Sequence, residues 1–212
     1  MNLIKKIKEL KKDKKLSKTI RQRLNEFQNL GNQGFPKCQK QNVLQHNKNL
    51  FSELCFCTLT AGASAQSGIK CQNALHKKFH KLSEKELQKE LKKLGYRFHN
   101  RASYIRENQN KIKILSKIQK MDSKQAREFL VKNFKGIGMK EASHFLRNIG
   151  RKDVAIIDRH ILRSLGFRID SLNKRNYLKI ESRLSELARK TRINLAEIDL
   201  LLWFWQTGKV LK

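Results

Sequence analysis

The sequence predicts an all-α protein of two helical lobes, and three observations favour this fold class. The chain has one proline, Pro36, among its 212 residues, so little interrupts a helix. Apolar residues recur at helical spacing along nearly the whole chain, and the alternation that is typical of strands is scarce. We expect roughly eight to ten helices from this pattern.

The first half of the chain contains two long apolar patterns of helical period. Residues 1–30 are predicted to form a basic amphipathic helix, and residues 30–39, LGNQGFPKCQ, a loop. A second apolar helix is expected from Leu44 to about Ala61. Its many large apolar side chains indicate that it lies at the centre of a core.

Capping residues indicate where several later helices begin. A serine or aspartate followed three residues later by Glu or Gln forms a capping box, in which each residue bonds the other's backbone amide. Two capping boxes are predicted, Ser83 with Glu86, which opens a helix ended by Gly95, and Asp122 with Gln125. Asn194, with Glu197 three residues later, is predicted to open the last helix. A short break is expected near Arg168–Asn173, before a helix around Tyr177–Lys190.

The charge of the chain is strongly positive. There are 48 Lys and Arg against 18 Asp and Glu, a net charge of +30. Such an excess is self-repulsive, which points to a polyanionic partner, above all nucleic acid. An RNA-binding protein of ribosomal type and a general lysine-rich bias are alternatives. No apolar run resembles a signal peptide or a bilayer span, so we expect a soluble protein.

The four cysteines, Cys38, Cys55, Cys57 and Cys71, lack the paired spacing of zinc or iron–sulfur sites. Cys55 and Cys57 lie in an apolar run, where free cysteine behaves as a small hydrophobe. We therefore expect reduced, buried thiols and no metal site.

A helical hairpin is predicted at about residues 123–150, which include FLVKNFKGIGMKEASHFL. Gly136 and Gly138 permit a tight turn whose amides, with those of the next helix start, can bind an anion. This is how a helix-hairpin-helix binds a DNA phosphate without reading bases, and Lys135 adds positive charge. An ordinary helix–helix corner is the alternative.

Lys140 and Asp158 are candidates for chemistry. Lys140 follows the hairpin at a helix start, where a positive charge is disfavoured, and a neutral lysine amine can form a Schiff base with a sugar aldehyde. Asp158 ends the run DVAII and could simply cap the next helix. A carboxylate there could also stabilise the oxocarbenium-like state of N-glycosidic cleavage. The alternative for Lys140 is another phosphate contact.

These residues resemble the helix-hairpin-helix DNA glycosylases, and the surrounding sequence is similar to the archaeal-type 8-oxoguanine DNA glycosylase/AP lyase family. The similar stretches include FSELCFCTLTAGASAQSGIK, LGYRFHNRASYI, DVAIIDRHILR and LLWFWQTGKVLK. The resemblance covers essentially the whole chain. It implies a two-lobed fold with the active site in the cleft between lobes, Lys140 as the nucleophile at C1′ and Asp158 as its assisting carboxylate. β-Elimination would then nick the strand.

The resemblance also implies residues that recognise the base. Trp203 and Phe98 would stack on the flipped base, with Tyr96 as an alternative to Phe98, and Asp199 and Lys212 would approach its polar edge. From the residues alone, the aromatic stripe around Trp203 is typical of a core, and Asp199 could be a solvated helix position. Each of these assignments stays an expectation.

Two further positions belong to the region that follows the apolar helix. The resemblance implies that Gln66 enters the gap that the base leaves, although a solvent-exposed amide is the alternative. The family pattern leads us to expect Asn at position 62, where this chain has Gly62. The loop's role in opposite-base preference is therefore open.

The resemblance implies a metal-free and cofactor-free enzyme that acts as a monomer on double-stranded DNA containing 8-oxoguanine. The expected location is the cytoplasm of a prokaryote, at the nucleoid. Two alternatives remain, namely a glycosylase for another damaged base on the same scaffold and a non-catalytic helix-hairpin-helix module.

Overall fold

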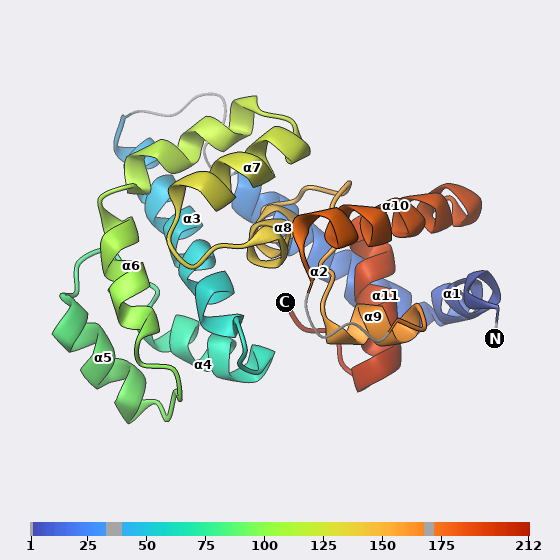
Figure 1. Ribbon diagram of the computed structural model, residues 1–212, viewed down its shortest axis with the longest axis horizontal. Helices are drawn as coiled ribbons and strands as arrows, with labels where there is room; N and C mark the ends of the chain where they lie inside the picture. Colours follow the sequence, from blue (N-terminus) through green and yellow to red (C-terminus); the bar gives the residue numbers. More distant parts are fainter. Residues whose placement is uncertain (1, 33–39, 168–171) are drawn as a thin grey trace. The chain divides into compact units, whose positions relative to one another are not determined.

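The computed structural model describes residues 2–32, 40–167 and 172–212. Within these ranges the chain forms eleven α-helices and one 3-10 helix, and no strand (Figure 1). The all-α prediction is confirmed, although the helices outnumber the eight to ten expected. Most of the predicted loop at 30–39 and of the break near 168–173 lies outside the described residues. In the described part of the chain, no helix has both the length and the hydropathy of a bilayer span.

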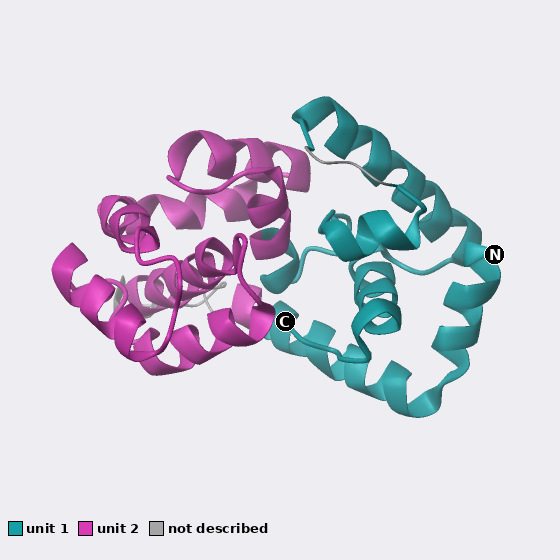
Figure 2. Cartoon of the chain, turned by 60° about the horizontal axis from the view of Figure 1, so that its bottom comes forward, with its two compact units in different colours: residues 1–29, 146–212 teal, residues 30–145 magenta. Residues whose placement is uncertain are grey.

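The chain forms two compact units (Figure 2). Unit 1 comprises Met1–Asn29 and Leu146–Lys212, and unit 2 comprises Leu30–Phe145. The two ends of the sequence therefore fold together in unit 1, while the middle of the chain forms unit 2. The passages between the units fall within helices α2 (Lys14–Asn32) and α8 (Met139–Asn148).

The N-terminal part of unit 1 is two helices where the sequence predicted one. Helix α1 (Leu3–Lys12) ends at Asp13, which has an extended conformation, and α2 begins at the next residue. The Asp13 carboxylate accepts a hydrogen bond from the backbone N–H of Leu16 (2.9 Å). The prediction of a continuous helix over 1–30 is wrong because Asp13 caps a new helix. The apolar face is nonetheless continuous, since Ile7 and Ile20 are both buried.

The C-terminal part of unit 1 contributes α9 (Arg159–Ser164), α10 (Lys174–Thr191) and α11 (Leu195–Thr207). Helix α11 packs against α1, α9 and α10. The side chain of Asn194 caps α11, as predicted, by accepting a hydrogen bond from the N–H of Glu197 (2.9 Å). The apolar first half of α11 is buried and forms the centre of this unit.

Unit 2 is built around α3 (Lys40–Thr60). Residues 50–60 are all buried, which confirms the prediction of a core helix. Helices α4 (Ala65–Leu75) and α6 (Arg101–Gln109) and the 3-10 helix η1 (Ile112–Lys120) pack against it. Helix α5 (Glu84–Lys93) packs on α6, at the far side from α3 in Figure 1.

Helices α7 (Ser123–Asn133) and α8 form the predicted hairpin, at the C-terminal end of unit 2. The capping boxes predicted at Ser83 and at Asp122 are both present, with both reciprocal hydrogen bonds. Local sequence therefore determined where α5 and α7 begin.

Gly150, in unit 1, and Gly95, in unit 2, together provide a test of how closely α2 packs on Gly150. Both follow a helix with positive φ, +92° and +71°, but a Cβ on Gly150 would lie 2.8 Å from the Gln28 Cα, whereas nothing lies within 4 Å at Gly95. We expect Gly95→Ala to cost about 1–2 kcal/mol from backbone strain alone. Gly150→Ala should cost roughly 1–3 kcal/mol more, because it also overpacks a backbone contact. Denaturant unfolding of both variants measures this difference, and equal losses would contradict the close approach of α2.

Candidate active site

The turn between α7 and α8 requires glycine at position 136. Gly136 has φ +74°, and a Cβ there would lie 2.5 Å from the ring of Tyr104. Ile137 is buried, so the turn is anchored on its inner side. The hairpin is therefore held against α6 through a contact that no other residue type at position 136 permits.

Asn108, which the sequence analysis missed, fixes the same turn. Its buried amide accepts a hydrogen bond from the backbone N–H of Lys135 and donates one to the Lys135 carbonyl, both at 2.9 Å. The Lys135 side chain is exposed. An asparagine inside a helix was the only signal in the sequence, and it did not reveal a partner 27 positions away.

A shallow open hollow adjoins the turn. Its lining includes Gly136 and Gly138 together with Lys111, Lys132 and Lys135. Glu107 is the one acidic residue in this lining. Three lysines around a glycine turn give the hollow the charge that suits an anion.

One amide of the turn, which the sequence predicted to be available to an anion, already has a partner. The N–H of Gly138 donates to Oε2 of Glu141 (3.3 Å), and Oε1 of the same carboxylate pairs with Nζ of Lys140 (3.1 Å). The Lys140 side chain is 30% exposed. A carboxylate in the first turn of a helix is favourable for the helix dipole. The Glu141 carboxylate therefore contacts both the turn and the candidate nucleophile, Lys140.

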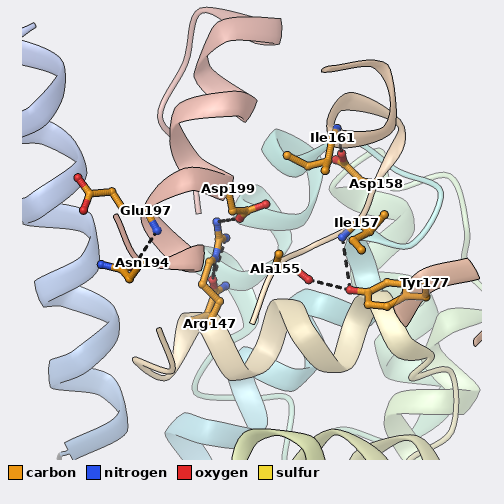
Figure 3. A network of polar contacts seen from close by, with 10 residues as sticks. Arg147, Ala155, Ile157, Asp158, Ile161, Tyr177, Asn194, Glu197 and Asp199 are labelled. Carbon is orange, nitrogen blue, oxygen red and sulfur yellow. Dashed lines mark hydrogen bonds and ion pairs between the residues drawn. The ribbon is translucent and has the colours of Figure 1, made fainter. Parts of the chain in front are cut away.

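Asp158 caps α9, which confirms that part of its prediction. One carboxylate oxygen, Oδ1, accepts hydrogen bonds from the N–H groups of His160 (2.8 Å) and Ile161 (2.9 Å). Figure 3 shows the contact with Ile161. The second oxygen, Oδ2, takes part in neither bond. Capping therefore fixes the carboxylate by one oxygen and leaves the other outside the cap.

Asp199 lies in the interior of unit 1, so the alternative of a solvated helix position is wrong. Its carboxylate is 3% exposed and pairs with the Arg147 guanidinium at 2.8 Å (Figure 3). Burial raises the pKa of Asp199 from 3.8 to about 7, the negative charge of Asp158 adds to this rise, and Arg147 opposes it. The expected contact of Asp199 with a base stays a prediction.

Trp203 is half-buried on α11, one turn after Asp199. Its ring meets the His160 ring edge-on, with centroids 5.8 Å apart and an interplanar angle of 64°. The sequence predicted that the apolar residues around Trp203 belong to a core, and this is confirmed for Leu200, Leu201 and Leu202, which are buried. The aromatic residues that follow, and Lys212, are only half-buried.

In unit 2, Phe98 and Tyr96, the two candidates for stacking on the base, differ in burial. Tyr96 is buried and its hydroxyl donates to the Leu59 carbonyl (2.7 Å), whereas Phe98 is half-buried with the Arg97 guanidinium 5.7 Å from its ring centre. Phe98 is the better placed of the two to meet a ligand. Gly62 lies beside the Phe98 ring with φ +73°. Asn tolerates this conformation better than most residues, so Gly62 and the expected Asn suit the same turn.

Gln66 is exposed in the first turn of α4, after the capping residue Ser64. This position is compatible with a DNA contact and with a solvated amide. Cys55, Cys57 and Cys71 are buried, as expected, and burial raises the pKa of Cys55 well above its ordinary value. The candidate residues are thus divided between the units, with Lys140 in unit 2 and Asp158 in unit 1.

A glycine hairpin followed by a lysine, with an aspartate that caps the following helix, defines the helix-hairpin-helix class of DNA glycosylases. A family model described as 8-oxoguanine DNA glycosylase matches residues 20–193. The chain belongs to this 8-oxoguanine DNA glycosylase family.

Relatives with curated names span the whole chain. An 8-oxoguanine DNA glycosylase/AP lyase of Methanocaldococcus jannaschii is 45% identical and aligns over 100% of both chains. An enzyme of the same name from Thermotoga petrophila is 39% identical over 96% of this chain and 97% of its own.

Solved structures agree with these relatives. The crystal structure of the M. jannaschii 8-oxoguanine glycosylase/lyase in complex with a 15mer DNA containing 8-oxoguanine matches with a TM-score of 0.90 at 43% identity, over 100% of both chains. The Thermotoga maritima 8-oxoguanine DNA glycosylase matches with a TM-score of 0.88 at 37% identity, over 99% of this chain and 98% of that one.

The raised pKa of Asp199 makes stability depend on pH. Between pH 4 and 7 the folded protein keeps a proton on Asp199 that the unfolded chain has lost, so this group's contribution to stability falls as pH rises. We expect the free energy of unfolding of the wild type, minus that of Asp199→Asn, to fall by up to about 1.4 kcal/mol per pH unit in this range. Urea unfolding at several pH values measures it. A difference that is constant with pH would contradict the raised pKa of this carboxylate.

Proposed function

We propose that this protein is a bifunctional DNA glycosylase and AP lyase that removes 8-oxoguanine from double-stranded DNA. The proposal rests mainly on two reactive side chains at matching places in the fold of this family. Lys140 follows the glycine hairpin that suits a phosphate, and Asp158 caps the next helix, in a chain of the 8-oxoguanine DNA glycosylase family. The M. jannaschii relative was crystallised with DNA containing 8-oxoguanine, which supports this choice of base.

The reaction begins at the sugar of the damaged nucleotide. Once Lys140 has given up a proton, its Nζ forms a bond to C1′ while the glycosidic bond breaks and the base leaves with the electron pair. The Asp158 carboxylate stabilises the positive charge that develops on the sugar. Ring opening gives a Schiff base, and loss of a C2′ proton then expels the 3′ phosphate by β-elimination.

Charge and backbone donors supply the DNA contacts. The hairpin around Gly136 and Gly138 binds a backbone phosphate with help from Lys135, and Gln66 fills the space left by the flipped base. The net charge of +30 favours this partner, since neutralising phosphates releases counterions. We expect a monomer that acts on the nucleoid in the cytoplasm of a prokaryote.

Recognition of the base combines stacking with hydrogen bonds. We propose that Trp203 and Phe98 stack on the two faces of the base, and the partial exposure of both rings supports this role. Lys212 contacts the polar edge. 8-Oxoguanine carries an N7–H donor that guanine lacks, so an acceptor there discriminates between them. Asp199 remains a candidate for this acceptor.

The nucleophile is tested by borohydride trapping on a duplex with one 8-oxoguanine. The wild type should form a covalent protein–DNA adduct, and Lys140→Gln should form none because it lacks the amine. Lys135→Gln is the matched control, since it removes a neighbouring lysine of the same hairpin and should weaken binding but keep the adduct.

The alternatives give different results in the same assay. Trapping with an oxidised-pyrimidine duplex but not with 8-oxoguanine would indicate another damaged base. DNA binding without an adduct on any duplex, an abasic one included, would indicate a non-catalytic module.

Trp203→Ala tests the stacking assignment. Loss of one base–aromatic stack removes roughly 1–3 kcal/mol, so excision of 8-oxoguanine should fall by about ten- to a hundredfold. Nicking of an abasic duplex should change much less, since no base is present to stack. Single-turnover rates on the two duplexes measure both effects, and equal losses on both would argue against a base contact.

A further inference from the structure

The residues immediately before Asp158 are held by side chains from two helices of unit 1. The Tyr177 hydroxyl, on α10, donates to the Ala155 carbonyl (2.8 Å) and accepts from the Ile157 N–H (3.4 Å), as Figure 3 shows. The backbone of Ile156 lies close enough to the Asp199 carboxylate, on α11, to lower its pKa. Buried backbone groups need such partners. The extended segment 155–157 is buried, Tyr177 supplies such partners to Ala155 and Ile157, and the Asp199 carboxylate lies beside the backbone of Ile156.

Asp199 is itself fixed by Arg147. One guanidinium nitrogen pairs with Asp199, and the other two bond Oδ1 of Asn148 at 2.9 and 3.1 Å. The guanidinium also lies over the ring of Phe27, 5.0 Å from its centre. A planar guanidinium held on three sides gives the Asp199 carboxylate a defined position.

Asp158 continues directly from the held segment. Its backbone N–H donates to the Ile156 carbonyl (3.1 Å), and its Oδ1 caps α9. The orientation of the carboxylate is therefore set on one side by the cap and on the other by residues 155–157. Any shift of that segment moves Asp158.

We propose that Tyr177, Asp199 and Arg147 are positioning residues for Asp158, which they hold through the backbone of residues 155–157. This proposal rests on the function proposed above for Asp158. Tyr177 is 1% exposed and the Arg147 side chain 4%, so neither is open to a DNA substrate. Their influence on the reaction must pass through Asp158. For Asp199 the proposal differs from a direct contact with the base.

Tyr177→Phe is the principal test, because it keeps the buried ring and removes only the hydroxyl. The measurement is single-turnover excision from an 8-oxoguanine duplex at several enzyme concentrations, which separates the limiting rate from the half-saturating concentration. We expect the limiting rate to fall by about tenfold or more, since small displacements of a reacting group are costly. The half-saturating concentration should stay within about twofold of the wild type, a split that lost stability alone does not produce.

Gln109→Met is the matched control. Gln109 is also buried and donates to two backbone carbonyls, those of Phe79 and Leu82, both at 2.8 Å, but it lies in unit 2. We expect this variant to melt earlier, as Tyr177→Phe does, and to keep the wild-type limiting rate. An unchanged rate in Tyr177→Phe, or an equal loss in both variants, would overturn the proposal.

A double-mutant cycle separates positioning from base contact. Tyr177→Phe and Asp199→Asn are each combined with Asp158→Asn and assayed with excess enzyme over hours. Residues that act through Asp158 should lower the rate less than about twofold once Asp158 is gone. An equal fall in both backgrounds would overturn the proposal and, for Asp199, indicate a base contact. If Asp158→Asn itself keeps the wild-type rate, the proposed function of Asp158 fails instead.

Asp199→Asn leaves Arg147 buried without its partner, which can prevent folding. The double variant Arg147→Met/Asp199→Leu replaces the pair by apolar groups of similar size and avoids this problem. It should melt near the wild type yet show the same loss of limiting rate as Tyr177→Phe, because the backbone of Ile156 no longer has the Asp199 carboxylate beside it. A folded double variant with the wild-type rate would overturn the role of the pair.

Discussion

The ion pair between Arg147 and Asp199 is the interaction on which the arrangement of the buried polar groups around it in unit 1 depends. A buried carboxylate is costly unless it is paired and hydrogen-bonded, and here it is both. The pair connects the end of α8, the first half of α11 and the segment before Asp158. In this protein of net charge +30, the Asp199 carboxylate is thus buried, and it contacts polar groups from separate stretches of the chain.

The features that the sequence predicted well depend on neighbours in the chain. The caps at Ser83, Asp122 and Asn194 each join residues three positions apart, so their spacing is visible in the sequence. The core helix α3 was likewise evident from its apolar side chains. Asp13 was missed because its capping role depends on one hydrogen bond within an otherwise continuous amphipathic pattern.

The parts of the candidate site that were missed join residues far apart in the sequence. Asn108 and Lys135 are 27 positions apart, and Arg147 and Asp199 are 52 apart. Nothing in the local composition indicates such partners, since a buried polar pair forms only after the helices have packed. Lys140 and Asp158 could be proposed because chemistry restricts the residue types that serve as nucleophile and carboxylate. The side chains that hold them in place carry no such restriction.

The carboxylate of Glu141 gives the hairpin an electrostatic property of its own. It bonds the Gly138 amide and pairs with Lys140, so it acts as a tethered counterion. A phosphate that takes the same amide must displace it, and the displaced charge stays attached to the protein instead of diffusing into the solvent. Occupation of the hairpin is then an exchange of one anion for another. Such an exchange gains less from counterion release than the number of phosphate contacts would suggest.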